Sequence, residues 1–139
     1  AKASDPSERI PLMQGSGCHD GLVRDKYVFF TSVSGHILKV DIEKRMVIQD
    51  IDISKLVQMP VGWTRCLEGI GNRAFVATTA LRGSKFKKYL KWVMRSPAKI
   101  RTPSAIFQID LSKESLVDSY EFTMYPHAAV YTILQHPIM

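Results

Sequence analysis

Residues 26–53 of this chain read KYVFFTSVSGHILKVDIEKRMVIQDIDI, and three short strands are predicted within them. Residues 27–32 are rich in aromatic and β-branched side chains, and the Ser34-Gly35 pair that follows is a turn signal. A second apolar run comes next, and residues 46–53 alternate between apolar and polar side chains. Runs this short, separated by turn residues, favour an antiparallel meander over helices.

The same pattern occurs a second time further along the chain. Residues 73–83 match residues 26–35 at an offset of 47 near the start of the match, and residues 106–117 match residues 37–48 at an offset of 69. The two offsets differ by 22 residues, so the second copy carries an insertion of about that length. Three residues of the first copy recur in the second: Ile37, Asp41 and Lys44 return as Ile106, Asp110 and Lys113.

The chain of 139 residues is expected to form one domain, or part of one, and 45% of its residues are hydrophobic. We place repeat 1 at about residues 18–53 and repeat 2 at about residues 63–122, with the insertion at residues 82–103. Residues 54–62 are interpreted as a connection between the repeats. Residues 127–134 resemble the first strand of a third repeat.

Each repeat is predicted to begin with a strand of its own, at residues 18–24 in repeat 1 and 63–70 in repeat 2. With that strand, each repeat has four. The expected fold class is therefore all-β: two four-stranded antiparallel units, a partial third unit and a short basic helical insertion.

Residues 26–53 resemble the repeat of YVTN-type and quinoprotein-like β-propellers. In those repeats a strand runs into a Ser-Gly turn, then a Val-x-x-Asp strand, a polar turn and a Val-rich outer strand. Residues 104–122 carry the resemblance less fully, and residues 43–45 depart from it because a glycine would be usual in that turn. The resemblance implies propeller-like blades and says little about activity, since propellers host many unrelated functions.

Two blades alone would leave apolar faces open, because propellers typically have four to eight blades. The chain is therefore expected either to assemble with copies of itself or to be a piece of a longer protein. Three copies would supply about six blades, which can close into a ring. A compact β-sandwich is the alternative architecture.

The net charge of +6 is concentrated in one segment. Eight basic residues and no acidic residue lie between residues 82 and 102. Residues 84–95 have apolar side chains at helical spacing among these charges, which predicts a basic amphipathic helix. We expect it to contact an acidic protein or an anionic membrane surface; nucleic acid is the least favoured partner, and packing on the sheet is the alternative. The predicted contact residues are Lys85, Phe86, Lys87, Lys88, Leu90, Lys91, Trp92 and Arg95.

The first strand of each propeller blade lines the central channel, so its polar residues are candidates for function. The candidate channel-lining residues are His19, Asp20, Trp63, Arg65 and His127. Imidazole and thiolate groups are usual ligands of transition metals. The candidate metal ligands are therefore Cys18, His19, Cys66 and His127, although their spacing matches no known metal motif. No cofactor is predicted, and a transition metal is the alternative.

Two cysteines do not make a disulfide framework, so both are expected to be reduced, with one disulfide or a shared metal site as alternatives. His36 is expected in a solvent-facing loop. The sequence has no phosphate-binding glycine loop, nucleophile elbow or zinc-protease motif, and no run of 18 apolar residues. The favoured function is a non-catalytic binding or scaffold module. The alternative is a propeller enzyme with a His/Asp/Cys site, with or without a metal, at the channel mouth; the compartment is left open.

Overall fold

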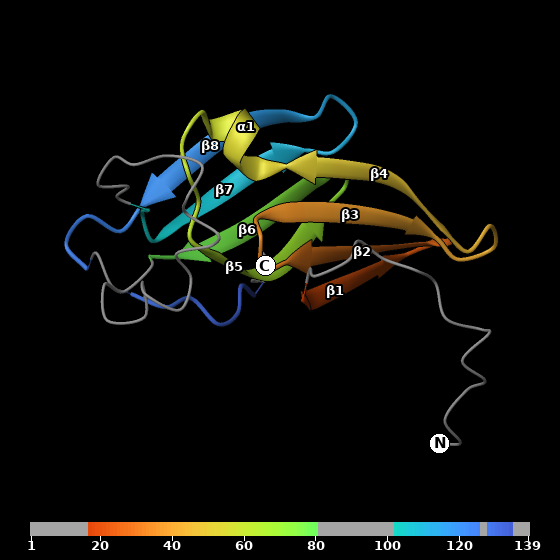
Figure 1. Ribbon diagram of the computed structural model, residues 1–139, viewed down its shortest axis with the longest axis horizontal. Coiled ribbons are helices and arrows are strands. Elements are labelled where there is room, and N and C mark those ends of the chain that lie inside the picture. Colours follow the sequence, from red (N-terminus) through yellow and green to blue (C-terminus); the bar gives the residue numbers. More distant parts are fainter. Residues whose placement is uncertain (1–16, 81–101, 126–127, 135–139) are drawn as a thin grey trace, which may run out of the picture.

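The computed structural model describes residues 17–80, 102–125 and 128–134. Within them, eight strands form two four-stranded antiparallel sheets, and one short helix connects the sheets (Figure 1). The first sheet contains, in spatial order, β1 (Cys18–Arg24), β2 (Tyr27–Ser32), β3 (His36–Asp41) and β4 (Met46–Asp52). After α1 (Ile53–Val57), the second sheet contains β5 (Trp63–Ile70), β6 (Arg73–Thr79), β7 (Ala105–Asp110) and β8 (Ser115–Glu121).

The prediction of mostly β structure is confirmed, and β1, β2, β4 and β5 lie within one residue of their predicted bounds. The helix α1 was not predicted. It begins where β4 ends, because the Asp52 carboxylate accepts hydrogen bonds from the backbone N–H groups of Ser54 and Lys55. This is the usual chemistry of a helix N-cap. The predicted connection at residues 54–62 therefore starts with a helical turn.

The first strand predicted for a third repeat is not formed by residues 128–134, which are the part of that segment that the structure describes. Residues 128–134 form no strand, and no described strand pairs with them to complete a hydrogen-bond ladder. They are attached to the second sheet by other contacts, such as the hydrogen bond from Ser104 Oγ to the Ala128 carbonyl oxygen at 2.8 Å. The predicted helix at residues 84–95 and the candidate His127 lie outside the described residues.

The repeated aspartate and lysine mark the same hairpin turn in the two sheets. The Asp41 and Asp110 carboxylates accept hydrogen bonds from the backbone N–H groups of Lys44 and Lys113, at 2.9 and 3.0 Å. The next residues, Arg45 and Glu114, both have a positive φ, of 55° and 48°. Glycine is the usual residue in that conformation, but here arginine and glutamate adopt it. The two turns therefore have the same backbone conformation at this position.

Strand pairing shows how positions in one sheet correspond to positions in the other. Tyr27 lies opposite Asp41 and Arg73 lies opposite Asp110, so β2 and β6 are related by an offset of 46, one residue less than the sequence comparison suggests. The strands β3–β4 and β7–β8 are related by an offset of 69. Their register shifts fall at the matching steps Lys39–Val40 and Gln108–Ile109.

This correspondence defines a front face and a back face for each sheet. The front face carries Phe29 and Ile37 in the first sheet and Phe75 and Ile106, at the equivalent positions, in the second. The back face carries Phe30 and Leu38 in the first sheet and Val76 and Phe107 in the second.

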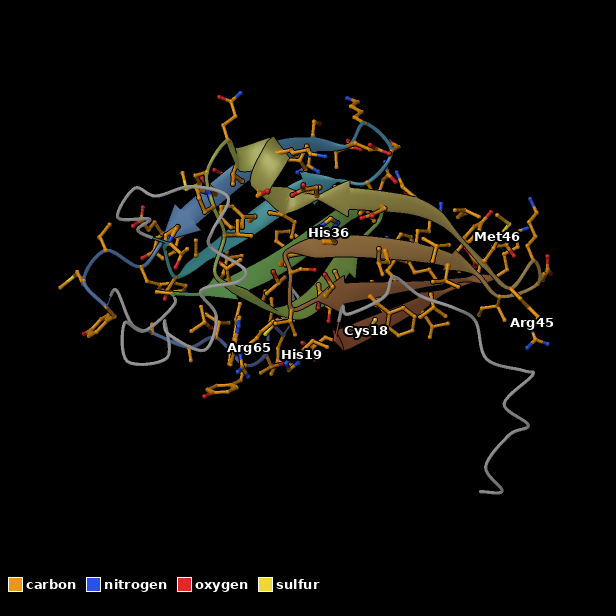
Figure 2. The ribbon with its side chains drawn as sticks, in the orientation of Figure 1. Cys18, His19, His36, Arg45, Met46 and Arg65 are labelled. Atoms are coloured by element: carbon orange, nitrogen blue, oxygen red, sulfur yellow. The ribbon has the colours of Figure 1, made fainter. Side chains whose placement is uncertain are left out.

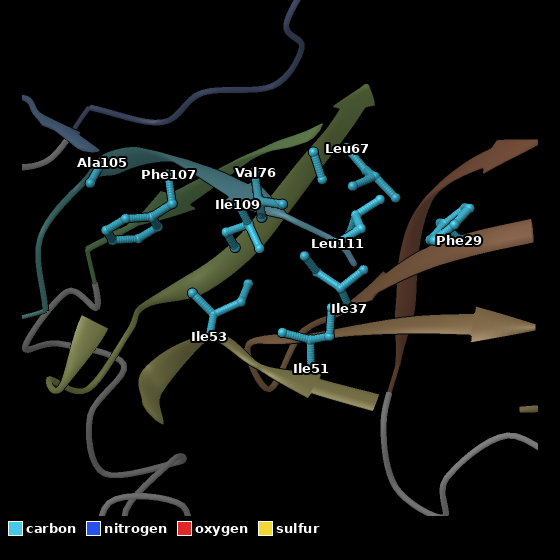
Figure 3. Close-up of a cluster of buried hydrophobic side chains, with 11 residues drawn as sticks. Phe29, Ile37, Ile51, Ile53, Leu67, Val76, Ala105, Phe107, Ile109 and Leu111 are labelled. Atoms are coloured by element: carbon cyan, nitrogen blue, oxygen red, sulfur yellow. The ribbon is translucent and has the colours of Figure 1, made fainter. Parts of the chain in front are cut away.

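The hydrophobic core forms where the front face of the first sheet packs on the back face of the second. Figure 3 shows Ile37 and Ile51 of the first sheet facing Ile109 of β7 and Leu111, which directly follows β7. The core cluster of buried residues comprises Phe29, Ile37, Ile51, Ile53, Leu67, Ala74, Val76, Ala105, Phe107, Ile109 and Leu111. The front face of the second sheet and the back face of the first lie outside this cluster.

Two glycines that flank β5 test how closely the backbone approaches β6 within the second sheet. A Cβ atom at Gly62 would collide with the backbone carbonyl of Thr79, whereas a Cβ at Gly71 would meet nothing within 4 Å. Gly71 has a φ of +54°, so alanine there should cost about 1 kcal/mol. Gly62→Ala should reduce the free energy of unfolding by about 3 kcal/mol, because backbone must move. Urea unfolding measures both variants, and an equal or smaller loss for Gly62→Ala would contradict the close approach of Gly62 to Thr79.

Candidate functional site

The first strands of the two sheets, β1 and β5, lie against each other and carry most of the candidate residues. Both strands have a register shift in this region, between Cys18 and Gly21 in β1 and between Arg65 and Leu67 in β5. Such β-bulges re-aim side chains and are common beside functional sites. Figure 2 shows Cys18, His19 and Arg65 along the lower side of the view.

Asp20 connects the two sheets at these bulges. Its Oδ2 atom accepts a hydrogen bond from the backbone N–H of Cys66 at 2.6 Å. Cys66 has a positive φ of 56°, a conformation that is costly for a residue with a side chain. A charged acceptor forms one of the stronger hydrogen bonds to a backbone N–H, so Asp20 stabilises this local backbone shape.

The Cys66 thiol is a buried structural group. It donates a hydrogen bond to the Val130 carbonyl oxygen at 3.5 Å. Burial raises the pKa of the Cys66 thiol to about 11; the Asp20 carboxylate also raises this pKa, and Arg65 lowers it. The thiol is therefore protonated at neutral pH, whereas nucleophiles and metal ligands are thiolates.

Arg65 contacts two aromatic rings. Its Cζ atom lies 5.5 Å from the centre of the Trp63 ring and 5.3 Å from the centre of the Tyr131 ring. Cation–π contacts of this kind fix the position of a guanidinium group. Tyr131 comes from residues 128–134, and the sequence carries no signal that would have placed it beside Arg65.

Two polar atoms next to these rings have no hydrogen-bond partner among the described residues. They are Arg65 Nε and the Oγ1 atom of Thr79, whose strand position is opposite Trp63. Both atoms are buried. A buried donor without an acceptor costs about 1–3 kcal/mol, so an acceptor oxygen close to Arg65 Nε would stabilise this arrangement.

The structure brings together only some of the residues predicted to form a site. Asp20 contacts the backbone of Cys66, and Trp63 contacts the adjacent Arg65. His19 is exposed on β1, and His127 lies outside the described residues. Within residues 17–80, 102–125 and 128–134, no group of three or more His, Cys, Asp or Glu side chains is arranged to hold a metal ion. Both cysteines are free: Cys18 is exposed and Cys66 is buried.

Two further predictions concern His36 and the basic segment at residues 84–95. His36 was expected in a solvent-facing loop, which is wrong: it opens β3, and its half-buried ring forms a 2.7 Å contact between Nδ1 and Asp50 Oδ1. The predicted contact surface for an acidic protein or membrane, on residues 84–95, lies outside the described residues and stays a prediction. The helix α1 is five residues long, too short to cross a membrane.

No protein-family model matches the chain, and no curated protein matches it. The interpretation of the site therefore rests on its geometry.

The two cysteines should differ sharply in reactivity. At pH 8, iodoacetamide should modify Cys18 quickly and Cys66 slowly, because Cys66 is buried and its pKa is about 11. Mass spectrometry of digests follows each site, and the variants Cys18→Ala and Cys66→Ala identify the two signals.

Equal rates at both sites in the folded protein would contradict the buried, protonated state of Cys66. Protection of both cysteines by added zinc would instead support the metal alternative.

Proposed function

We propose that this chain is a non-catalytic binding module built from propeller-type blades, with a ligand site around Arg65. The observation that carries the proposal is the guanidinium of Arg65, which contacts the rings of Trp63 and Tyr131 and has a buried Nε atom without a hydrogen-bond partner among the described residues. The ligand class is an organic carboxylate, either a small acid or the acidic group of a peptide. An arginine fork matches the shape and charge of a carboxylate.

The propeller-type arrangement is supported by the orientation of the two sheets. The front of the first sheet packs on the back of the second, so both sheets face the same way, as successive blades do. A sandwich made by turning one copy of the meander to face the other would join two front faces. The adjacency of β1 and β5 also supports the proposal, because these are the first strands of their sheets.

The contacts of residues 128–134 add support. Asp20 of β1 contacts the backbone of Cys66 in β5, and Cys66 in turn contacts the backbone of Val130. Asp20 and Cys66 are 46 residues apart, which is the offset between the first halves of the two repeats. The contact between β5 and residues 128–134 therefore corresponds to the contact between β1 and β5.

Binding is favoured over catalysis by the state of the two reactive side chains nearest to Arg65. The Cys66 thiol is protonated and bonded to a carbonyl oxygen, and the Asp20 carboxylate is bonded to a backbone N–H. Both groups thus serve the local structure rather than acting as a free nucleophile or base. The planar guanidinium of Arg65 presents a fork of N–H donors, which suits recognition of a carboxylate rather than proton transfer.

Carboxylate binding gives the test of this proposal. Isothermal titration with acetate, glutarate and an acidic peptide should detect binding to the wild type, and the amide analogue of each should bind more weakly. Arg65→Ala should abolish binding. Arg65→Lys should weaken it about tenfold, because lysine keeps the charge but lacks the planar fork.

Arg73→Ala is the matched control, since Arg73 is an exposed arginine on the neighbouring strand. It should bind as the wild type does. Carboxylate binding that survives Arg65→Ala, or equal binding of acids and amides, would contradict the proposed site.

A further inference from the structure

The pair formed by Trp63 and Arg65 has no counterpart in the first sheet. The pairing of β1 with β2 and of β5 with β6 relates β1 to β5 by the offset of 46. At that offset, Gly17 and His19 stand where the second sheet has Trp63 and Arg65. A four-stranded sheet of this type therefore forms without an aromatic–arginine pair, and the role of the pair lies in its contacts at the surface.

The positive charge of Arg65 is not neutralised by an ion pair within residues 17–80, 102–125 and 128–134. The ion pairs of these residues have Lys26, His36 and Lys55 as their cationic members. The Asp20 carboxylate accepts its hydrogen bond from the backbone N–H of Cys66. The guanidinium is therefore available to a carboxylate that a ligand supplies.

Tyr131 presents an exposed ring beside this charge. Tyr131 is 71% exposed, and Arg65 Cζ lies 5.3 Å from the centre of its ring. Tyr120 is almost as exposed, at 65%, but within the described part of the chain its ring contacts Phe122 and no cation. Small-molecule sites combine aromatic surface with a few polar groups that orient the ligand. Tyr131 and Arg65 provide one of each.

We propose that the ligand of this site is an arylalkyl carboxylate, whose carboxylate binds Arg65 and whose aromatic ring packs on the ring of Tyr131. The inference rests on the proposed carboxylate site and narrows its ligand class. A ligand with only a carboxylate leaves Tyr131 in water. An aromatic acid buries apolar surface of both rings and gains a favourable ring–ring contact.

The spacing of the two groups limits the length of the ligand. Because Arg65 Cζ lies 5.3 Å from the centre of the Tyr131 ring, a linker of about one or two carbon atoms between carboxylate and ring lets a ligand reach both. Two sources have this chemistry: a free aromatic acid such as phenylacetate, and the C-terminal phenylalanine or tyrosine of a peptide.

Isothermal titration of the wild type tests the ligand class. Phenylacetate and 3-phenylpropionate should bind about ten times more tightly than acetate, because only these two acids reach Tyr131. Cyclohexylacetate has a similar size but no aromatic ring, and its affinity should fall between those of acetate and phenylacetate. Phenylacetamide keeps the ring and loses the charge, so it should bind more weakly than phenylacetate.

Variants of Tyr131 test the position of the ligand ring. Tyr131→Leu keeps an apolar side chain but removes the ring, so it should weaken phenylacetate binding about fivefold and leave acetate binding unchanged. Tyr131→Phe keeps the ring and should bind both acids as the wild type does. Tyr120→Leu is the matched control, since it removes an exposed tyrosine of β8, and it should also bind both acids normally. Circular dichroism checks that each variant is folded.

A peptide with a free C-terminal phenylalanine separates the two sources. Tighter binding of this peptide than of phenylacetate, lost when its C-terminus is amidated, would identify a peptide C-terminus as the ligand. Tighter binding of phenylacetate would identify a free aromatic acid.

Two results would overturn the aromatic ligand class while leaving the carboxylate site in place. They are equal binding of acetate and phenylacetate by the wild type, and a preference for phenylacetate that survives Tyr131→Leu. Absence of binding for every acid would instead overturn the carboxylate site, and this inference with it.

Discussion

The structure depends on burying the front face of the first sheet against the back face of the second. Ile37, Ile51 and Phe29 contribute from one side, and Val76, Phe107 and Ile109 contribute from the other. Each large apolar side chain that is fully buried contributes about 1.5–3 kcal/mol. An isolated four-stranded meander would leave this face in water, so neither sheet has a complete core without the other.

Polar contacts at the rim give this interface one orientation. Asp20 bonds the Cys66 backbone at the inner strands, Gln49 bonds the β7–β8 turn at the outer strands, and Arg24 lies on the Gly69–Gly71 segment. A sheet that slipped by one residue would turn its apolar side chains to the other face and lose all three contacts. The same orientation places Arg65 at the inner strands, where β5 lies beside β1.

Local patterns in the sequence were sufficient for the strands and turns. Alternation and β-branched residues located β2 and β4, and the recurring Asp41 and Asp110 each cap a turn. Contacts between residues that are distant in the sequence were not predicted. Tyr131 meets Arg65 only through tertiary packing, and His36 is fixed by Asp50 on the neighbouring strand. The helix α1 had a local signal in Asp52, a good N-cap residue, which the strand pattern of β4 obscured.

The orientation of the two sheets is tested most directly by nuclear Overhauser effects in the folded protein. Front-to-back packing predicts a strong effect between the Leu22 methyl groups and the Gly69 α-protons, because a Cβ at Gly69 would lie 2.8 Å from Leu22 Cδ2. It also predicts no effect between the rings of Phe29 and Phe75, which lie on equivalent front faces. Observation of the Phe29–Phe75 effect without the Leu22–Gly69 effect would show a front-to-front sandwich and contradict the account.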